Sequence, residues 1–206
     1  MLTDTVLPGW LAEFRRTHPG VHIEAVAGHQ NLSLRRRQAD IAIRATAQPP
    51  EDAIGRRICS FRFGFFATEE CLARQGERHL RDMEFVGISG IQSWFVPTLW
   101  KSAKASERRL VYHSSSVGSA VQAARAGMGV LPMAYYGVAP FDDLLHLSPY
   151  PPKDMALWLL VHPDLRRTTR VKVLKDFLAD KLAGHASVFD GTSAGPPRLD
   201  VDWAAM

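Results

Sequence analysis

The sequence has little of what marks a disulfide-rich, metal-binding or membrane protein. Its 206 residues include two cysteines, Cys59 and Cys71, so buried thiols are expected rather than a disulfide framework. The eight histidines are scattered without the paired spacing of a zinc site, and neither a metal nor a cofactor is expected. No apolar run approaches the roughly 20 residues that a membrane-spanning helix needs, so no membrane contact is expected.

Motifs of catalysis and nucleotide binding are missing as well. Residues 127–129 are Gly-Met-Gly but lack the third glycine of a dinucleotide-binding fingerprint, and no phosphate-binding G-x-x-x-x-G-K-S/T loop occurs. No serine lies in a G-x-S-x-G nucleophile elbow. We therefore expect a protein that is not an enzyme and has no catalytic residues. Asp4 and Pro8 do not fit a signal peptide, which predicts a cytoplasmic location.

The chain does have the composition of a globular protein with a basic balance. Hydrophobic residues make up 46% of it and charged residues 22%, which is enough to bury one good core or two small ones. The net charge of +4 is compatible with contact with nucleic acid but is not evidence for it. The arginine run 35–37 is either a nucleic-acid patch or, more simply, the solvated face of a helix.

One central stretch organises the predicted fold. Residues 110–112 are a short apolar run typical of a strand, and the serines at 114–116 offer hydroxyls that cap the start of a helix. Apolar residues recur at helical spacing over 117–124, and Gly127 is expected to end this helix in a left-handed conformation. Residues 130–131 follow as the next strand. A strand–helix–strand unit this short predicts parallel strands, with ligand groups at strand ends and helix starts.

Other elements follow from periodicity on either side of that stretch. Residues 7–14 carry apolar residues at helical spacing, and the proline at 19 ends this helix by pushing the residue before it out of helical geometry. Residues 21–26 and 40–44 are predicted to be buried strands, and residues 54–68 to be strand almost throughout. Further elements are predicted as strand at 85–88, helix at 94–104, strand at 144–147, strand at 155–161 and helix at 168–182.

Four motifs, taken in order, resemble those of one known family. They are L-P-G-W-L-A-E-F-R-R-T-H-P-G-V-H-I-E at 7–24, A-D-I-A-I-R at 39–44, A-A-R-A-G-M-G-V-L-P at 123–132 and L-W-L-L-V-H-P-D-L-R-R-T-T-R-V at 157–171. Each motif alone is weakly specific, but their order and spacing together are specific. On these motifs, residues 2–183 resemble the effector-binding domain of a LysR-type transcriptional regulator.

The resemblance implies an α/β fold with two Rossmann-like subdomains. This is the type 2 periplasmic-binding-protein fold, in which two crossover strands join the subdomains. Subdomain I is expected to comprise residues 1–66 and 150–183, and subdomain II residues 67–149. Residues 184–206 lose periodicity and gain Gly, Ser and Pro, so a C-terminal tail that is mobile or loosely docked is expected there.

The resemblance also implies a function. A small effector, usually a carboxylate in this family, binds in a cleft between the subdomains and controls transcription. The partners implied are that effector and further copies of the chain, in a homodimer or homotetramer. DNA is expected to be bound only through a helix-turn-helix absent from this chain, and the family's opening strand has no counterpart here either. The alternative is a stand-alone cytoplasmic solute-binding protein of the same fold.

Candidate effector-binding residues lie at strand ends and helix starts, where the resemblance places ligand contacts. The hydroxyls of Thr3, Thr5 and Ser114 also serve as ordinary helix caps, so two interpretations stay open for them. Arg44 either counters an anion or pairs with an acidic neighbour, and Met128 is expected to pack in a turn that lines the cleft. The predicted effector-binding residues are Thr3, Thr5, Gly28, His29, Gln30, Arg44, Ser89, Gly90, Ile91, Ser114 and Met128.

Two helices are predicted to pair between copies of the chain. The apolar stripe over residues 7–14 is wide for a helix covered only by its own sheet, and the resemblance pairs it with helix 117–126 of a second copy. Burial of Val121 within its own core is the rival interpretation. The predicted interface residues are Leu7, Trp10, Leu11, Phe14, Val117, Val121, Gln122 and Arg125.

Overall fold

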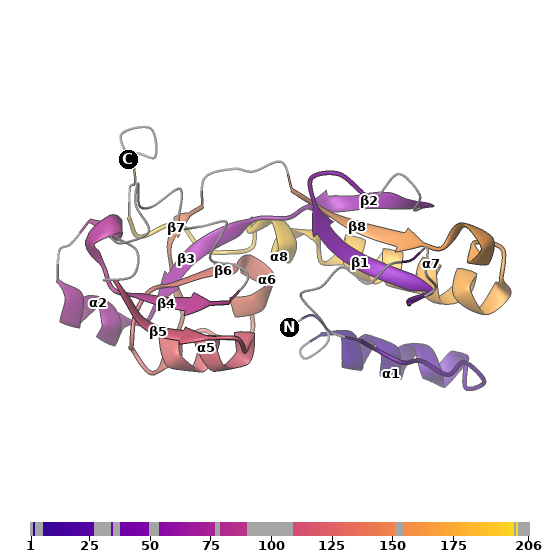
Figure 1. Ribbon diagram of the computed structural model, residues 1–206, viewed down its shortest axis with the longest axis horizontal. Coiled ribbons are helices and arrows are strands. Elements are labelled where there is room, and N and C mark those ends of the chain that lie inside the picture. The colour runs from indigo at the N-terminus through magenta and orange to yellow at the C-terminus, as the bar shows by residue number, and fades with distance from the viewer. Residues whose placement is uncertain are drawn as a thin grey trace. The chain divides into compact units, whose positions relative to one another are not determined.

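The computed structural model describes residues 2, 6–26, 34, 38–49, 54–76, 79–89, 109–150, 155–199 and 201. Helices and sheets are both present (Figure 1), which confirms the predicted α/β class. The chain divides into two units: unit 1 consists of Met1–Arg62 and Lys153–Asp190, and unit 2 of Phe63–Pro152 and Gly191–Met206. The chain therefore passes between the units three times, after residues 62, 152 and 190.

Unit 1 is built on an antiparallel sheet with the strand order β1-β8-β2. Its strands are β1 (Ile41–Thr46), β2 (Ile54–Ser60) and β8 (Ala156–Val161). The central strand β8 has the sequence A-L-W-L-L-V, is paired at both edges and is buried along nearly its whole length. The strand predicted over residues 155–161 from this apolar run is confirmed.

Two helices pack against this sheet, and a third packs against one of them. α7 (Thr169–Gly184) packs against β8 and β2, and α8 (Ala186–Asp190) packs against β2. The 3-10 helix η2 (Pro163–Leu165) connects β8 to α7. α1 (Leu7–Thr17) packs against α7. It ends at Thr17, just before His18 and Pro19, as the sequence predicted.

The contact between α1 and α7 is apolar at its centre and charged at its edge. The ring centroids of Phe14 and Phe177 lie 5.3 Å apart, and the Phe14 side chain is almost completely buried. At the edge, Lys181 Nζ lies 2.6 Å from Glu13 Oε2. α1 therefore buries its apolar stripe within unit 1.

Residues 21–26 do not form the strand that their alternation of apolar and polar residues predicted. They have no regular secondary structure, most of their side chains are exposed, and Val26 is 55% exposed. A strand is stable only when its backbone N–H and C=O groups are paired, and none of the described residues pairs with this segment as a strand. The prediction was wrong because periodicity shows which side chains share a face and not whether a neighbouring strand is present.

Unit 2 combines antiparallel and parallel strands. β3 (Phe63–Ala67) lies between β6 (Leu131–Ala134) and β7 (Leu145–Pro149) and is antiparallel to both. β4 (Phe85–Ile88) and β5 (Leu110–Ser114) pair in parallel, and a parallel bridge joins Phe85 to Val130 just before β6. The predicted parallel arrangement is confirmed for β4, β5 and the bridge at Val130, whereas β6 itself is antiparallel to its partner β3.

The helices of unit 2 begin and end at residues suited to those positions. They are α2 (Glu69–Gln75), η1 (Leu80–Asp82), α5 (Val117–Arg125) and α6 (Tyr135–Val138). Thr68 caps α2, because its Oγ1 accepts a hydrogen bond of 3.2 Å from Cys71 N. Gly127 follows α5 with a φ of 73°, which confirms the predicted left-handed conformation. Within the described part of the chain, we find no helix with both the length and the apolar character to cross a bilayer.

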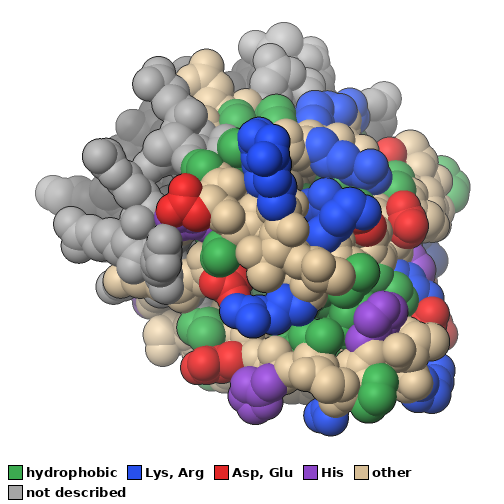
Figure 2. Space-filling model, turned by 90° about the vertical axis from the view of Figure 1, so that its right-hand side faces the viewer, with side chains coloured by type: hydrophobic (Ala, Val, Ile, Leu, Met, Phe, Trp, Pro, Cys, Tyr) green, Lys and Arg blue, Asp and Glu red, His purple; other side chains and the backbone are tan. Residues whose placement is uncertain are grey.

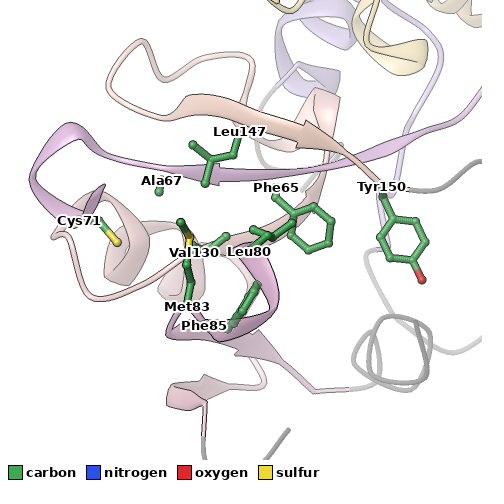
Figure 3. Packing of buried hydrophobic residues seen from close by; sticks show 9 residues of the cluster. All are labelled: Phe65, Ala67, Cys71, Leu80, Met83, Phe85, Val130, Leu147 and Tyr150. Atoms are coloured by element: carbon green, nitrogen blue, oxygen red, sulfur yellow. The ribbon is translucent and has the colours of Figure 1, made fainter. Parts of the chain in front are cut away.

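The core of unit 2 joins β4 to the antiparallel sheet (Figure 3). Phe65 and Phe85 are completely buried, and their rings meet edge to face with centroids 6.2 Å apart. Such an aromatic pair adds about 0.5–1.5 kcal/mol beyond the burial of its area. The cluster consists of Phe65, Ala67, Cys71, Leu80, Met83, Phe85, Val130, Leu147 and Tyr150.

The strand predicted over residues 54–68 is two strands in different units. β2 ends at Ser60 in unit 1 and β3 begins at Phe63 in unit 2. Between them, Arg62 N still donates a hydrogen bond of 3.0 Å to Phe189 O within unit 1. The sequence does not mark the boundary, because the connection Phe61-Arg62 contains neither a glycine nor a proline that would interrupt a strand.

Both cysteines are free, buried thiols, as predicted. Burial raises the pKa of the Cys59 thiol, the charge of Asp190 raises it further, and the charge of Arg57 acts in the opposite direction. Cys71 Sγ accepts a hydrogen bond of 3.1 Å from Gln75 Nε2 inside unit 2. A buried, protonated thiol is a poor nucleophile, so Cys59 is suited to packing rather than to chemistry.

Candidate functional site

Polar side chains meet at the carboxyl ends of β4 and β5. Because the two strands are parallel and Ile88 lies opposite Ser114, their ends lie at the same edge of the sheet. Ser89 N donates a hydrogen bond of 2.9 Å to Ser114 O, and Ser89 Oγ lies 3.3 Å from His113 Nε2. Ser89 and Ser114 were both predicted as effector contacts, and the structure brings these two residues together.

The start of α5 adds backbone donors beside this edge. Ser116 is the N-cap residue, and its Oγ accepts a hydrogen bond of 3.3 Å from Ser119 N. Ser116 N in turn donates to Ser114 Oγ at 3.0 Å. The first N–H groups of a helix have no partner within the helix and form the positive end of its dipole. The predicted capping role of the serine run is confirmed at Ser116. We name Ser89, His113, Ser114 and Ser116 the strand-end cluster.

A hydrogen bond and a buried helix face hold the strand-end cluster in place. Tyr112 Oη lies 2.6 Å from Ser119 Oγ and thereby joins β5 to α5. On the inner face of α5, the side chains of Ala120, Val121 and Ala124 are buried, and the helix packs against both parallel strands. The cluster offers hydroxyl, imidazole and backbone N–H groups and no carboxylate or thiolate. This donor set suits an anion better than a metal ion.

Arg44 lies in unit 1, in a row of three side chains across the sheet. Arg44 of β1 and Arg57 of β2 both lie opposite Trp158 of β8. Residues directly opposite each other on neighbouring strands point to the same face. Arg57 Nη2 donates to Ser60 Oγ at 3.2 Å, and within the described part of the chain Trp158 Nε1 is buried without a hydrogen-bond partner. The row consists of hydrogen-bond donors alone.

Met128 lies apart from the strand-end cluster, after the far end of α5. Arg74 Nη2 donates to the carbonyl oxygens of Gly127 and Met128 at 2.9 and 2.8 Å, and Arg74 Nη1 lies 2.6 Å from Glu84 Oε2. Glu84 directly precedes β4, so this turn lies at the amino end of that strand. The Met128 side chain is 38% exposed. The structure therefore places Met128 in a turn, as predicted, but does not bring it to Ser89 and Ser114.

The remaining predicted effector contacts lie outside the described residues. The same holds for the arginine run 35–37 and the helix predicted over 94–104. The predicted contacts concerned are Thr3, Thr5, Gly28, His29, Gln30, Gly90 and Ile91. Their roles stay predictions.

The apolar residues that were predicted to form a dimer interface on α1 are largely covered within unit 1. Leu7 and Trp10 are each 8% exposed and Phe14 is 1% exposed. The Trp10 ring lies 5.0 Å from the ring of His185, between centroids. Leu11 alone of the four is half-buried. These contacts account for most of the wide apolar stripe without a second copy.

On α5, the predicted interface residues divide into a core residue and surface residues. Val121 is 1% exposed in a single copy, which favours the rival interpretation that it belongs to the core of unit 2. Val117 is half-buried and Gln122 is exposed. Arg125 Nε lies 2.8 Å from Asp143 Oδ2. A surface for a second copy on this helix would therefore be formed by Val117, Gln122 and Arg125 rather than by Val121.

Basic side chains of unit 1 are mixed with acidic ones. Figure 2 faces the end of unit 1 at which α7 begins, and it shows Lys and Arg beside Asp, Glu and His. On α7, Lys172 Nζ and Lys175 Nζ lie 3.1 and 2.8 Å from carboxylate oxygens of Asp176. Hydrogen bonds from Lys175 and Lys172 lower the pKa of Asp176. Because such pairs offset one another, this part of the described surface is not an extended field of one sign.

Two members of the strand-end cluster were not predicted as effector contacts: Ser116 was predicted only as a helix cap, and His113 was given no role. The strand was predicted to end at Tyr112, whereas β5 runs to Ser114. Alternation along a strand sends His113 to the face opposite Tyr112, and its side chain is exposed. The signal that was available is a polar residue placed directly before the serine run. It is a weak one, because a histidine there is typical of any exposed strand end.

Comparison with known protein families decides the identity of the chain. The model of the LysR substrate binding domain matches residues 1–183. This chain belongs to that family. The resemblance predicted from the motifs is thereby confirmed, and with it the type 2 periplasmic-binding-protein fold. The LysR domain is the effector-binding part of a LysR-type transcriptional regulator.

Solved structures of LysR-type regulators are similar to this LysR domain at low sequence identity. The CrgA regulatory domain from Neisseria meningitidis is 20% identical with a TM-score of 0.68, and the match covers 88% of this chain and 94% of that one. The effector domain of AmpR from Pseudomonas aeruginosa is 16% identical with a TM-score of 0.67, over 90% and 92% of the two chains. At such identities the likeness shows the fold alone.

Full-length relatives extend well beyond the LysR domain. The full-length virulence activator AphB of Vibrio cholerae is 17% identical with a TM-score of 0.68, and the match covers 87% of this chain but 65% of AphB. An HTH-type transcriptional regulator of Xanthomonas campestris pv. campestris (strain 8004) is 30% identical over 76 residues, which are 36% of this chain and 22% of that protein. These relatives are transcriptional regulators rather than enzymes.

Proposed function

We propose that this LysR domain binds a small anionic effector, a carboxylate, at the strand-end cluster and so controls transcription. The cluster is the observation that carries the proposal. Its hydroxyls, its imidazole and the first N–H groups of α5 are donors that fit the oxygens of a carboxylate. The family resemblance supports the same class of effector, because small carboxylates are usual for LysR-type regulators.

The geometry of the cluster supports a site that exists before the effector binds. Ser89 and Ser114 are joined through their backbones, and Ser116 is joined to both Ser114 and Ser119. When a ligand binds such a site, no entropy is lost in ordering the residues that contact it, so the affinity is higher than for a disordered site. The row of donors at Arg44, Trp158 and Arg57 in unit 1 is a second set that fits an anion. The cleft implied by the resemblance stays a prediction.

The proposed partners follow from the family. We propose that copies of the chain associate as a homodimer or homotetramer in the cytoplasm, and that DNA is bound through a helix-turn-helix outside the matched residues. The relative in Xanthomonas campestris supports the DNA part, since it is described as an HTH-type regulator. Residues 1–183 are therefore assigned to sensing rather than to base recognition.

A carboxylate screen tests the effector proposal. The chain is heated with a set of small aliphatic and aromatic carboxylates and with the matching uncharged amides, and its unfolding temperature is measured. A carboxylate at a hundred times its Kd is expected to add about 2.7 kcal/mol of stability, and its amide much less. If every carboxylate leaves the unfolding temperature of a folded chain unchanged, or the amides act equally, the effector is not an anion of this kind.

Two matched substitutions locate the binding site. Ser89→Ala removes one hydroxyl of the cluster and is expected to weaken the carboxylate about 2- to 12-fold, the equivalent of about 0.5–1.5 kcal/mol for one hydrogen bond. Ser115→Ala is the control, because Ser115 is an exposed serine in the same turn, outside the strand-end cluster. Equal Kd values for the two variants in titration calorimetry would place the effector elsewhere.

A further inference from the structure

The C-terminal segment of the chain leaves unit 1 and lies along unit 2. After α8 ends at Asp190, the chain passes into unit 2 at Gly191 and stays there. Gly191 has a φ of 79°, and a Cβ at this position would lie 2.6 Å from the ring of Tyr135. Only glycine satisfies both the conformation and the close approach. The segment therefore begins at a position shaped for its contact with unit 2.

The backbone of the segment bonds to β7. Arg198 N donates to His146 O at 3.1 Å, and Leu199 N donates to Leu147 O at 2.8 Å. β7 is an edge strand of the sheet β6-β3-β7, and an edge strand presents backbone groups that an added segment can pair with. Figure 1 shows the yellow end of the chain beside β7. The segment is thus hydrogen-bonded to this edge of the sheet without forming a further strand.

His146 forms a second attachment through its side chain. Its Nδ1 lies 3.0 Å from Gly195 O, and its Nε2 lies 2.9 Å from Tyr135 Oη. A carbonyl oxygen can only accept, so Nδ1 carries a proton and donates it to Gly195. The Tyr135 hydroxyl fixes the other side of the ring. His146 is therefore oriented toward the segment from within unit 2.

Side chains of the segment form one charged and two apolar contacts with unit 2. Arg198 Nη1 lies 2.6 Å from Glu69 Oε1 at the start of α2. Leu199 and Val201, two residues apart, pack against the core cluster of unit 2, which contains Leu147 (Figure 3). Glu69 therefore accepts the arginine of the segment, and the core cluster accepts its two apolar side chains.

We propose that the edge of β7 is a docking site for a segment of chain, and that residues 191–201 of the same chain occupy it reversibly. The site has three elements: the carbonyl oxygens of β7 with the His146 ring, the carboxylate of Glu69, and the apolar surface beside Leu147. Two backbone hydrogen bonds to β7, the exposed His146–Gly195 hydrogen bond and the exposed Arg198–Glu69 ion pair contribute to holding the segment, and Leu199 and Val201 are only partly buried. An attachment made of exposed polar contacts and partly buried side chains can be released. Docking gives the chain a connection to unit 2 beyond the passages after residues 62 and 152.

The test empties the site in the full chain and offers the segment back as a peptide. Leu199→Asp puts a charge against the apolar surface and is expected to release the segment. A fluorescein-labelled peptide of residues 191–201 is then expected to bind this variant at least ten times more tightly than the unchanged chain, in which the tethered segment competes at high effective concentration. Pro196→Asp, which adds the same charge at an exposed position, is expected to behave like the unchanged chain.

Each outcome of the anisotropy titration decides the proposal. Equal binding to all three chains, or binding to none, overturns it. Amide hydrogen exchange of the unchanged chain gives a check that needs no variant: the amides of Arg198 and Leu199 are expected to exchange at least tenfold more slowly than in the free peptide, and equal rates overturn the proposal. A dimer that Leu199→Asp converts to a monomer would overturn it by making the occupant the segment of a second copy.

Discussion

Replacing Val121 with aspartate is expected to unfold unit 2. The Val121 side chain is 1% exposed on the inner face of α5, so a carboxylate there would be buried without a partner. An uncompensated buried charge costs about 3–5 kcal/mol, which is a large part of the stability of an ordinary domain. Urea unfolding followed by circular dichroism measures the loss, and sedimentation of the same samples measures self-association.

The neighbouring residue provides the control for this substitution. Gln122 is exposed, so Gln122→Asp adds the same charge to the same helix without burying it. Its free energy of unfolding is expected to change by about 0.5 kcal/mol or less. A Val121→Asp chain that is as stable as the Gln122→Asp chain but has become monomeric would show that Val121 belongs to an interface between copies and not to the core.

Replacing Phe14 with alanine is expected to destabilise unit 1 by about 3–5 kcal/mol. The Phe14 ring is 1% exposed, stacks on the ring of His18 at 4.4 Å and meets the ring of Phe177 at 5.3 Å, between centroids. Its removal leaves a cavity between α1 and α7 that rigid helices fill only in part. Trp10 and Trp158 both belong to unit 1, so tryptophan fluorescence during urea unfolding includes the transition of that unit.

Glu13→Ala is the matched control on the same helix. It removes the ion pair with Lys181, in which both side chains are partly exposed, and such surface pairs contribute about 0–1 kcal/mol. If Phe14→Ala and Glu13→Ala unfold at the same urea concentration, the α1–α7 contact does not stabilise unit 1 as described. An effect of Phe14→Ala on sedimentation alone would instead support the interface predicted from the sequence.

The elements that the sequence predicted well are those in which one local signal decides the structure. Ser116 caps α5 and Gly127 takes a positive φ because each position requires a particular chemistry or conformation. β8 was predictable because six consecutive apolar residues fit a central strand. In each case the information lies within a few residues of the feature.

The elements that the sequence did not predict depend on partners distant in the chain. Residues 21–26 alternate as a strand does, yet none of the described residues pairs with them. The stripe of α1 was too wide for a sheet alone because Phe177 and other residues of α7 cover it. The composition of residues 184–206 predicted a tail that is mobile or loosely docked, which stays a prediction, but did not indicate that β7 would accept hydrogen bonds from Arg198 and Leu199.

The position of the candidate site at strand ends could be predicted from the sequence, but the full set of its residues could not. Ser89 and Ser114 were selected as strand-end residues, and the parallel pairing of β4 and β5 brings them together. His113 was not selected, because a histidine at an exposed strand end is not a specific signal for a binding site. Met128 was selected from the resemblance, whereas the turn that contains it lies beyond the other end of α5. Strand ends can be found in a sequence, but which ends meet is decided by the sheet.

The most direct test of the central claim is a nuclear magnetic resonance titration with the carboxylate that stabilises the chain most. Amide resonances of the uniformly labelled chain are followed as the carboxylate is added. Binding at the strand-end cluster predicts that the amides of Ser89 and of residues 113–118 shift together along one saturation curve, while those of α7 stay unchanged. Saturable shifts confined to other segments, with these amides unmoved, would contradict the assignment of the effector site.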